Sequence, residues 1–141
     1  MELDERFGHA LHATARTWRQ AIDRRLKHLG LSQASWMAIA TLAKDEPQSQ
    51  TELASRLGVE DPTMVTMVDR MVKAGYMERQ PSSTDRRVKL IHLTDAGRAI
   101  YHKVRAVADP LRRELLADVP RDELERMTRI LEALNAKLGE W

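Results

Sequence analysis

A cluster of charged residues, Asp85, Arg86 and Arg87, lies in the stretch STDRRVKLIHLTDAG over residues 83–97. The cluster precedes a short apolar run, so its side chains would lie at the tip of a strand, where ordering two long arginines is costly. Arginines on a thin projecting loop suit the minor groove of A·T-rich DNA, whose narrow geometry concentrates negative potential. Asp85 would repel phosphate, and we expect it to hold a neighbouring arginine through a charge-assisted hydrogen bond.

Residues 61–73 carry a second set of side chains suited to binding. At about 100° per residue, one face of a helix over these residues is apolar and contains Met64, Val65, Val68, Met71 and Val72. The opposite face is small, polar and basic, and it contains Thr63, Thr66, Arg70 and Lys73. A face of this kind can enter a major groove and contact base edges and phosphates. Taken alone, it is equally typical of an ordinary solvent-exposed helix.

The elements that would position this face form a helix-turn-helix. Ser32 caps an expected helix, and a further short helix, TELASRL, ends at Gly58. Asp61 as N-cap and Pro62 at the first helical position start the next helix, which runs to Gly75. Two short helices joined by a three-residue turn are the signature of the motif.

Two strands are expected beyond the helix-turn-helix, over residues 76–80 and 87–93. They bracket PSSTDR, a loop rich in turn-forming residues that places the arginines at its tip. The order helix, tight turn, helix and two-stranded wing is far more specific than any one face, and it favours binding to DNA over a merely solvated surface.

Both ends of the chain are expected to form long amphipathic helices. Apolar residues at three-, four- or seven-residue steps mark a helix over residues 1–30, and similar stripes continue over residues 98–141, where Pro110 predicts a kink or break. The apolar surface of these helices is larger than a small winged-helix domain can bury by itself, which favours a homodimer. The alternative is that the terminal helices pack only on each other within one chain, as in a monomeric bundle.

The composition limits the kinds of function. The chain has 141 residues, a formal net charge of +2 and no cysteine, and its pI is about 9.1. This length suits one domain over residues 1–141, and the basic balance permits an anionic partner without requiring one. Thiolate catalysis, cysteine-ligated zinc and disulfides are excluded. The N-terminal stretch MELDERFGHALHATARTWRQ is neither a signal peptide nor a membrane anchor, so we expect a soluble cytoplasmic protein without a membrane partner.

No metal, no cofactor and no catalytic residues are expected. His9 and His12 lie three residues apart, a spacing that can chelate a metal, but two histidines near a terminus are more often polar surface. The sequence contains no nucleophile elbow, phosphate loop or zinc-hydrolase motif. No set of catalytic residues can therefore be named for an enzyme. The main alternative to a DNA-binding protein is a helical protein–protein interaction module, which would keep the terminal stripes but has no use for the arginine wing.

From Arg16 to about Gly97 the sequence resembles MarR-type winged-helix transcription factors, especially the SlyA subgroup. The resemblance rests on WRQAIDRRLKHLGLSQASW, ELASRLGVEDPTMVTMVDRMVKAGYMER and DRRVKLIHLTDAG. It implies a mainly α fold with a small β-wing, in which a winged helix-turn-helix over residues 31–97 lies between dimerisation helices over residues 1–30 and 98–141. It also implies a homodimeric transcriptional regulator of a palindromic double-stranded operator, acting as a repressor or displacing one.

The resemblance further implies roles for individual residues. The helix face from Thr63 to Arg70 would enter the major groove, Arg86 would reach the minor groove, and Arg87 would pair with Asp85 to stiffen the wing. The full set of expected DNA contacts is Pro62, Thr63, Thr66, Met67, Arg70, Asp85, Arg86 and Arg87. SlyA-like relatives usually carry arginine at the position of Thr66, which leaves the preferred base sequence open.

Arg16 and Trp36 form the expected effector site. A tryptophan early in a helix is most often core, and an arginine on a long helix is most often solvated. In SlyA-like proteins, however, the matching positions line a cleft between the dimerisation helices and the winged helix, where small aromatic carboxylates bind. Arginine beside an aromatic wall suits a benzoate-like anion such as salicylate, through a bidentate hydrogen bond and stacking. Relatives often have histidine at the position of Ala40, so the cleft here can differ from theirs.

Overall fold

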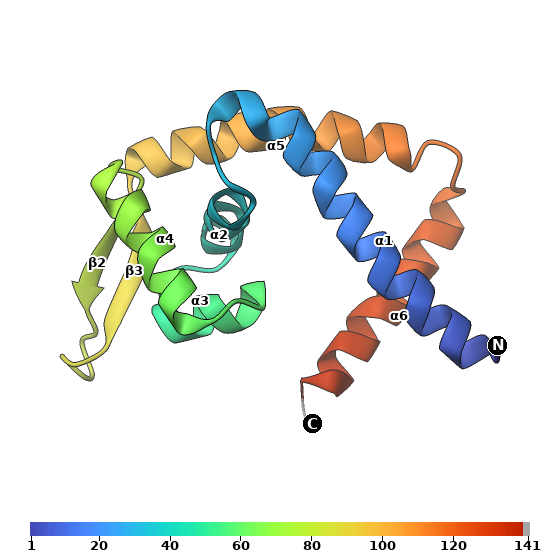
Figure 1. Cartoon of the computed structure of the whole chain (residues 1–141), viewed down its shortest axis with the longest axis horizontal. Helices are drawn as coiled ribbons and strands as arrows, with labels where there is room; N and C mark the ends of the chain where they lie inside the picture. The colour runs from blue at the N-terminus through green and yellow to red at the C-terminus, as the bar shows by residue number, and fades with distance from the viewer. Residues whose placement is uncertain (140–141) are drawn as a thin grey trace. The chain divides into compact units, whose positions relative to one another are not determined.

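The computed structural model describes residues 1–139, which form two compact units, one from Met1 to Ala108 and one beginning at Asp109 (Figure 1). The first unit includes the first turns of the helix that follows the wing, where Val104 and Ala108 are buried.

The first unit begins with the long helix α1 (Leu3–Leu26), which tightens into the single 3-10 turn η1 (Lys27–Leu29). Gly30 ends it in the left-handed conformation, at a φ of 72°, which glycine adopts without steric cost. Of the residues of α1, Ile22 and Leu26 are buried, both near its C-terminal end. The expected helix over residues 1–30 is confirmed, and most of its apolar stripe faces outward.

Two short capped helices follow, as predicted. In α2 (Gln33–Lys44) the side chain of Ser32 accepts a hydrogen bond from a backbone N–H of the first turn, and Ser49 does the same for α3 (Gln50–Leu57). Gly58 ends α3 at a φ of 67°. These are local signals, because the cap side chains supply partners for amide groups that the helix itself leaves unbonded.

Helix α4 (Asp61–Lys73) completes the helix-turn-helix, and its start corrects one prediction. The N-cap is Glu60, whose backbone is extended and whose carbonyl accepts from the N–H of Met64 at 3.0 Å; no side chain caps the helix. Asp61 is therefore the first helical residue and not the cap. Its carboxylate still lies at the positive end of the helix dipole, which explains why the residue type suggested a start.

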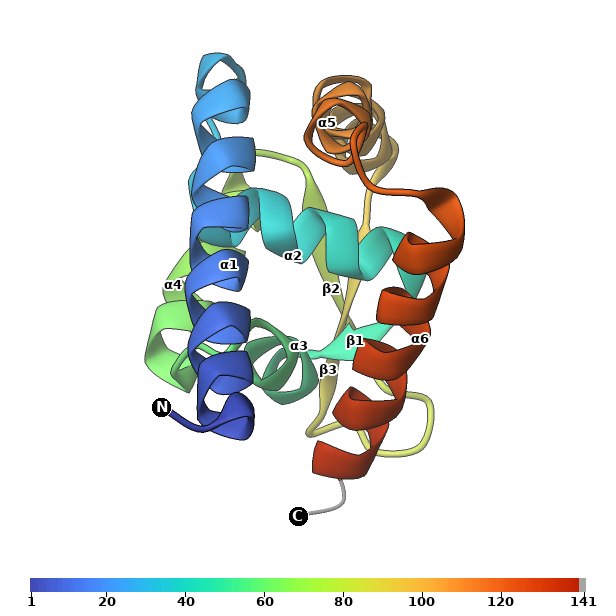
Figure 2. The same cartoon turned by 90° about the vertical axis from the view of Figure 1, so that its right-hand side faces the viewer.

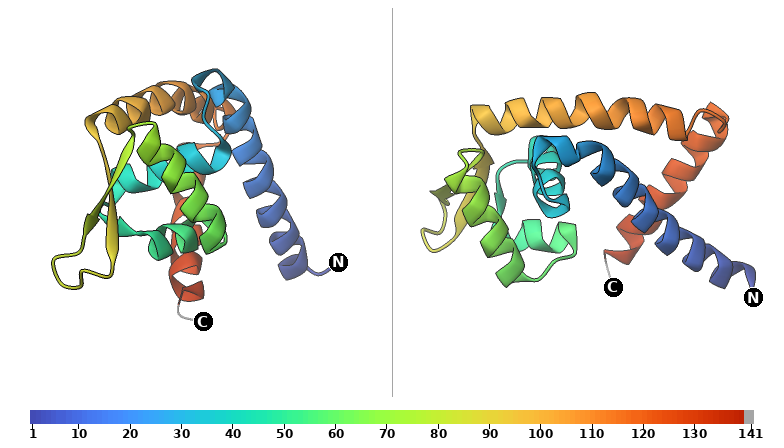
Figure 3. Two further views of the ribbon diagram at one scale, coloured as in Figure 1. Left: turned by 60° about the vertical axis from the view of Figure 1, so that its left-hand side comes forward. Right: turned by 45° about the horizontal axis from the view of Figure 1, so that its top comes forward.

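A three-stranded antiparallel sheet, in the order β1-β3-β2, lies beside these helices (Figure 2). The strands β2 (Met77–Pro81) and β3 (Lys89–Leu93) form the predicted wing, and the loop between them projects away from α2, α3 and α4 (Figure 3). The strand β1 (Gln48–Ser49) was not predicted. Two residues are too few to show a period, and this strand forms only because it pairs with residues 90 and 91 of β3.

The core of the first unit gathers apolar side chains from α2, α3, α4 and the sheet. Its buried members are Ala38, Ile39, Leu42, Leu53, Ala54, Met64, Met67, Val68, Met71, Met77, Ile91 and Leu93. The strand β3 joins this core to the next helix, where a Cβ on Gly97 would lie 2.1 Å from the carbonyl oxygen of Tyr76. Only glycine allows this close approach, which fixes where the wing ends and the next helix begins.

Helix α5 (Asp95–Leu115) starts next to Thr94, whose hydroxyl accepts from the N–H of Gly97 at 3.1 Å. It continues through Pro110, so of the predicted kink or break the break does not occur. Pro110 is exposed, and the carbonyl that loses its helical donor there can bond to water instead. Helix α6 (Arg121–Leu138) has the predicted apolar spacing, yet none of its residues is buried.

Candidate nucleic-acid interface

Helix α4 divides into a buried face and an exposed face. Thr63, Thr66, Arg70 and Lys73 are all exposed, and Pro62 is exposed beside them at the helix start. Two assignments along the helix were wrong. Met67 was expected to contact DNA, but it is 6% exposed and belongs to the core, because it lies 60° from Met64 around the helix on the buried side. Val65 was expected to anchor the helix, but it is 38% exposed.

The exposed face offers fewer hydrogen-bond donors than its composition suggests. The hydroxyl of Thr66 donates to the backbone carbonyl of Pro62 at 3.1 Å, one turn earlier. Its proton is therefore used within the helix, and its methyl group and oxygen lone pairs remain for an outside partner. The basic side chains of Arg70 and Lys73 lie in the last turn, where they also favour the negative end of the helix dipole.

The wing is closed by backbone and side-chain hydrogen bonds around Asp85. The N–H of Ser82 donates to the carbonyl of Val88 at 2.8 Å, and the N–H of Val88 donates to the carbonyl of Asp85 at 3.0 Å. The Asp85 carboxylate accepts from Arg87 three times, from the backbone N–H at 3.0 Å, from Nε at 3.2 Å and from Nη2 at 3.3 Å. The expected Asp85–Arg87 pair is thus confirmed.

This pair has an electrostatic signature. Hydrogen bonds from the side chain of Arg87, and next from its backbone N–H, hold the pKa of Asp85 below its ordinary value. Arg86 stands next to the pair and is exposed, and no hydrogen bond or ion pair of its side chain is present among residues 1–139. At the tip of the wing, Arg87 is therefore held by the aspartate, while Arg86 remains able to reach an outside anion.

An ion pair that the sequence did not reveal ties the wing to α4. Nη2 of Arg79, on β2, lies 2.6 Å from Oδ1 of Asp69, on α4. The two residues are ten positions apart across a turn, so neither helical nor strand periodicity relates them. Only the packing of β2 against α4 brings them together. The pair joins the exposed face of α4 to the base of the wing.

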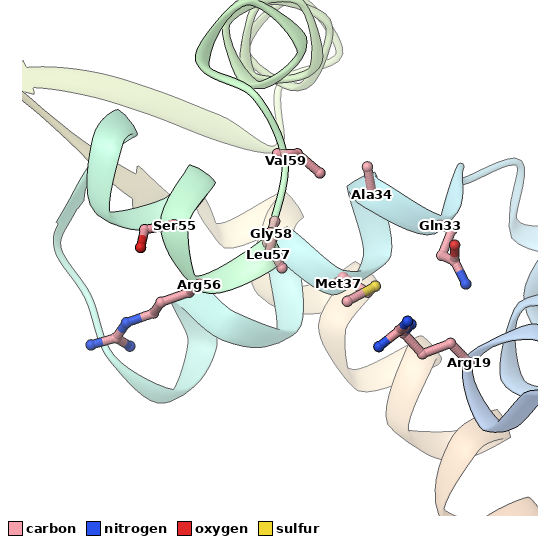
Figure 4. A pocket seen from close by; sticks show the side chains of 9 residues that line it. All are labelled: Arg19, Gln33, Ala34, Met37, Ser55, Arg56, Leu57, Gly58 and Val59. Carbon is pink, nitrogen blue, oxygen red and sulfur yellow. The ribbon is translucent and has the colours of Figure 1, made fainter. Parts of the chain in front are cut away.

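Neither of the expected effector residues is among those that line a cavity on the first unit. Arg16 is exposed on α1, whereas Trp36 is 5% exposed and its indole N–H donates to Oδ1 of Asp23 at 3.0 Å. A cavity of about 470 Å³ lies instead against α1, α2 and the end of α3. Its lining residues are Arg19, Gln33, Ala34, Met37, Ser55, Arg56, Leu57, Gly58 and Val59 (Figure 4).

The two arginines of this cavity have different surroundings. The guanidinium of Arg19 points toward Met37, while that of Arg56 points away from the other labelled side chains (Figure 4). Arg56 is also engaged by Asp45, with 2.7 Å between Nη2 and Oδ2. Arg19, one helical turn beyond Arg16 on α1, is thus the cation that faces the cavity. Helical spacing places Arg19 near Arg16 on α1, but only the packing of α1 shows which of these two arginines lines the cavity.

Two other kinds of site are absent from the described part of the chain. No group of three or more His, Cys, Asp or Glu residues is placed to hold a metal ion there. Within the same residues, no helix has the length and apolar character needed to cross a membrane.

Comparison with known proteins identifies the fold and the family. The model of the MarR family matches residues 31–89. The crystal structure of the transcriptional regulator PA3341 is 35% identical with a TM-score of 0.87, over 96% of this chain and 99% of that one. MarR from E. coli in complex with operator DNA is 23% identical with a TM-score of 0.76, over 95% and 99%. CouR from Rhodococcus jostii RHA1, bound to p-coumaroyl-CoA, is 23% identical with a TM-score of 0.80, over 95% and 94%.

The order of helices, the turn and the wing define a winged helix-turn-helix protein of the kind that binds DNA. Together with the family match and the 35% identity to PA3341, this fold shows that the chain belongs to the MarR family of transcriptional regulators. Regulators of this family are in general not enzymes, and the residues of the interface described above have no catalytic arrangement among them.

Proposed function

We propose that the protein regulates transcription by binding a palindromic operator as a homodimer, with α4 in the major groove and the wing in the minor groove. The observation that carries this proposal is the ion pair between Asp69 and Arg79, which joins the polar face of α4 to the base of the arginine wing. The residues proposed to contact DNA are Pro62, Thr63, Thr66, Arg70, Lys73 and Arg86. The Asp85–Arg87 pair supports the wing that carries Arg86. The structure of E. coli MarR in complex with operator DNA supports DNA binding by this chain.

The dimer is supported by the apolar side chains that α1 and α6 expose. On α1 these are Leu3, Phe7 and Leu11, at 71%, 45% and 38% exposure. On α6 they are Met127, Ile130, Leu131 and Leu138, between 40% and 57% exposed. A soluble monomer rarely leaves so many large apolar side chains in water. A second copy of the chain would cover them and supply the second head that a palindrome needs.

Selection of bound sequences from a random duplex library tests the function directly. We expect an inverted repeat whose half-site centres are roughly 10 bp apart, since two identical heads must meet the same side of the duplex. Affinity for the selected operator should fall steeply with salt, because phosphate contacts release counterions. Selection of no preferred duplex, with binding that does not respond to salt, would favour the interaction module over the regulator.

Substitution of Arg86 tests the placement of the wing. Arg86→Ala should weaken operator binding by ~1–3 kcal/mol without changing the oligomeric state, because the side chain is exposed and makes no contact that the fold needs. Arg129→Ala is the matched control, since it removes the same charge from α6. Equal affinities of the wild type and the Arg86 variant would contradict the minor-groove role.

We further propose that a small aromatic carboxylate binds in the cavity beside Arg19 and lowers the affinity for DNA, as expected for a SlyA-like regulator. The aromatic acyl ligand bound to CouR supports a small-molecule effector in general. A ligand acts on DNA binding only if it prefers the head arrangement unsuited to the operator, and operator DNA must then weaken ligand binding by the same factor.

Calorimetric titration with salicylate distinguishes the two arginines. The cavity geometry predicts that Arg19→Ala costs ~1.5–3 kcal/mol of ligand affinity, the range of a charge-assisted hydrogen bond, and that Arg16→Ala does not. The reverse result would restore the site based on Arg16 and Trp36. Unchanged affinity in both variants, or an operator affinity that saturating salicylate leaves unaltered, would exclude this effector mechanism.

A further inference from the structure

Large apolar side chains are exposed at two positions of the winged helix-turn-helix, residues 31–97, all of which the structure describes. They are Val65 on α4 and Val88 in the wing, and each is 38% exposed. Both lie on the elements that meet DNA under the proposed function. The other large apolar side chains of this region are at least partly buried.

Val65 lies at the edge of the surface that α4 exposes, between the buried face and the polar residues Thr66 and Lys73. It is next to Thr66 in the sequence and one helical turn before Asp69, which pairs with Arg79 on β2. The ion pair fixes this flank of the helix. Valine is also stiff about its first side-chain torsion in a helix, so Val65 is presented to a partner in a defined position and loses little freedom on binding.

Valine has no polar atom, so it can form no hydrogen bond to a base edge or to a phosphate. The major groove displays one apolar group, the C5 methyl of thymine. Thr66, the neighbour of Val65, has already donated its hydroxyl proton to Pro62, which makes this part of the helix poorer still in donors. The chemistry offered by residues 65 and 66 therefore matches a methyl group better than a donor–acceptor edge.

We propose that Val65 is a specificity-determining residue that recognises a thymine by contact with its 5-methyl group. This inference rests on the proposed function, in which α4 enters the major groove. It assigns a preference for thymine at one position of each half-site, where removal of the methyl group weakens binding without loss of any hydrogen bond.

The test uses the full-length protein and the operator selected from the random library. Each thymine is replaced in turn by uracil, which lacks only the methyl group, and affinity is measured for the wild type and for Val65→Ala. At one thymine of the half-site, uracil should cost the wild type roughly fourfold in affinity, the scale of one buried methyl-sized group. In Val65→Ala the same replacement should have no effect.

Two further variants keep the test decisive. Val65→Ile retains a branched apolar side chain and should retain the sensitivity to uracil, which excludes a merely misfolded helix as the cause. Val88→Ala is the matched control, because it makes the same deletion at a side chain of equal exposure on the wing, and the minor groove displays no methyl group. It should leave the response to uracil unchanged.

The outcomes separate this inference from the proposed function. Specific binding by the wild type that no uracil replacement weakens would overturn the role of Val65 while leaving the regulator intact. A sensitivity that persists in Val65→Ala would overturn it as well, since another side chain would then contact the methyl group. Failure of the wild type to select any duplex would refute the proposed function itself.

Discussion

Helices α4 and α6 are both amphipathic, but they use their apolar faces differently. In α4 the residues Met64, Met67, Val68 and Met71 are buried within their own chain. In α6 none of the residues from Arg121 to Leu138 is buried, although apolar residues recur with the same helical spacing. A stripe of apolar residues thus indicates that one face of a helix is buried against another surface. It does not indicate whether that surface belongs to the same chain or to a second one. The difference predicts that damage to α4 unfolds the head, whereas damage to α6 separates subunits.

The largest effect is expected for Leu131→Asp on α6. A carboxylate placed in a shared apolar seam would be buried without a partner, so the dimer should dissociate and operator binding should be lost. Sedimentation and operator binding measure the two consequences, and circular dichroism should show that the head keeps its helices. Ala133→Asp introduces the same charge on the opposite, exposed side of α6 and should leave the dimer intact. If the wild type sediments as a monomer at micromolar concentration, the proposed role of α6 in a dimer is wrong.

A smaller but still large effect is expected for Met64→Ala on α4. Met64 is 0% exposed, so truncation removes buried methylene groups and leaves a cavity, at a cost of ~2–5 kcal/mol in the free energy of unfolding. Urea denaturation at a fixed protein concentration measures it. The adjacent Val65→Ala is the control and should stay within about 0.5 kcal/mol of the wild type. Equal losses in the two variants would mean that both side chains are buried in solution.

Gly97→Ala tests the junction between the wing and α5, with an intermediate effect. The added Cβ would meet the Tyr76 carbonyl oxygen, so the backbone must shift, and we expect a loss of ~1–3 kcal/mol in the free energy of unfolding. Gly8→Ala on α1 makes the same change where no atom lies within 4 Å. Because alanine favours the helix, this control should gain ~0.5–1 kcal/mol instead. Thermal unfolding of both variants gives the sign of each change.

The smallest effect concerns the Asp85–Arg87 pair and its dependence on pH. Because Arg87 lowers the pKa of Asp85, the pair contributes order to the wing above the ordinary carboxyl pKa of 3.8. This contribution declines as the pH falls below 3.8 and is lost once the pH passes the lowered value. Amide exchange of Arg87 followed by NMR should report the loss, and Asp85→Asn should flatten the profile. A profile that is the same in both proteins would show that the carboxylate does not order the wing.

The DNA-binding head could be predicted well because its signals are local. Ser32 and Ser49 cap helices through bonds to residues three positions away, and Gly58 ends a helix by its own backbone conformation. The Asp85–Arg87 pair is equally local, with partners two positions apart. Prediction was weaker at the edges of helical faces. Met67 and Val65 lie on opposite flanks of the buried side of α4, where spacing alone cannot tell which flank the sheet and α3 cover.

Residue order by itself determined the helix-turn-helix, the wing and the amphipathic ends, since caps, turn residues and helical spacing act over a few positions. Tertiary structure alone decided the contacts between distant segments. The pairing of β1 with β3, the ion pair of Asp69 with Arg79 and the burial of Trp36 against Asp23 each join residues that no period relates. It also decided that Arg19, and not Arg16, faces the cavity. The physical reason is that a side chain's neighbours across elements depend on how whole helices and strands pack, and packing is set by the entire core at once.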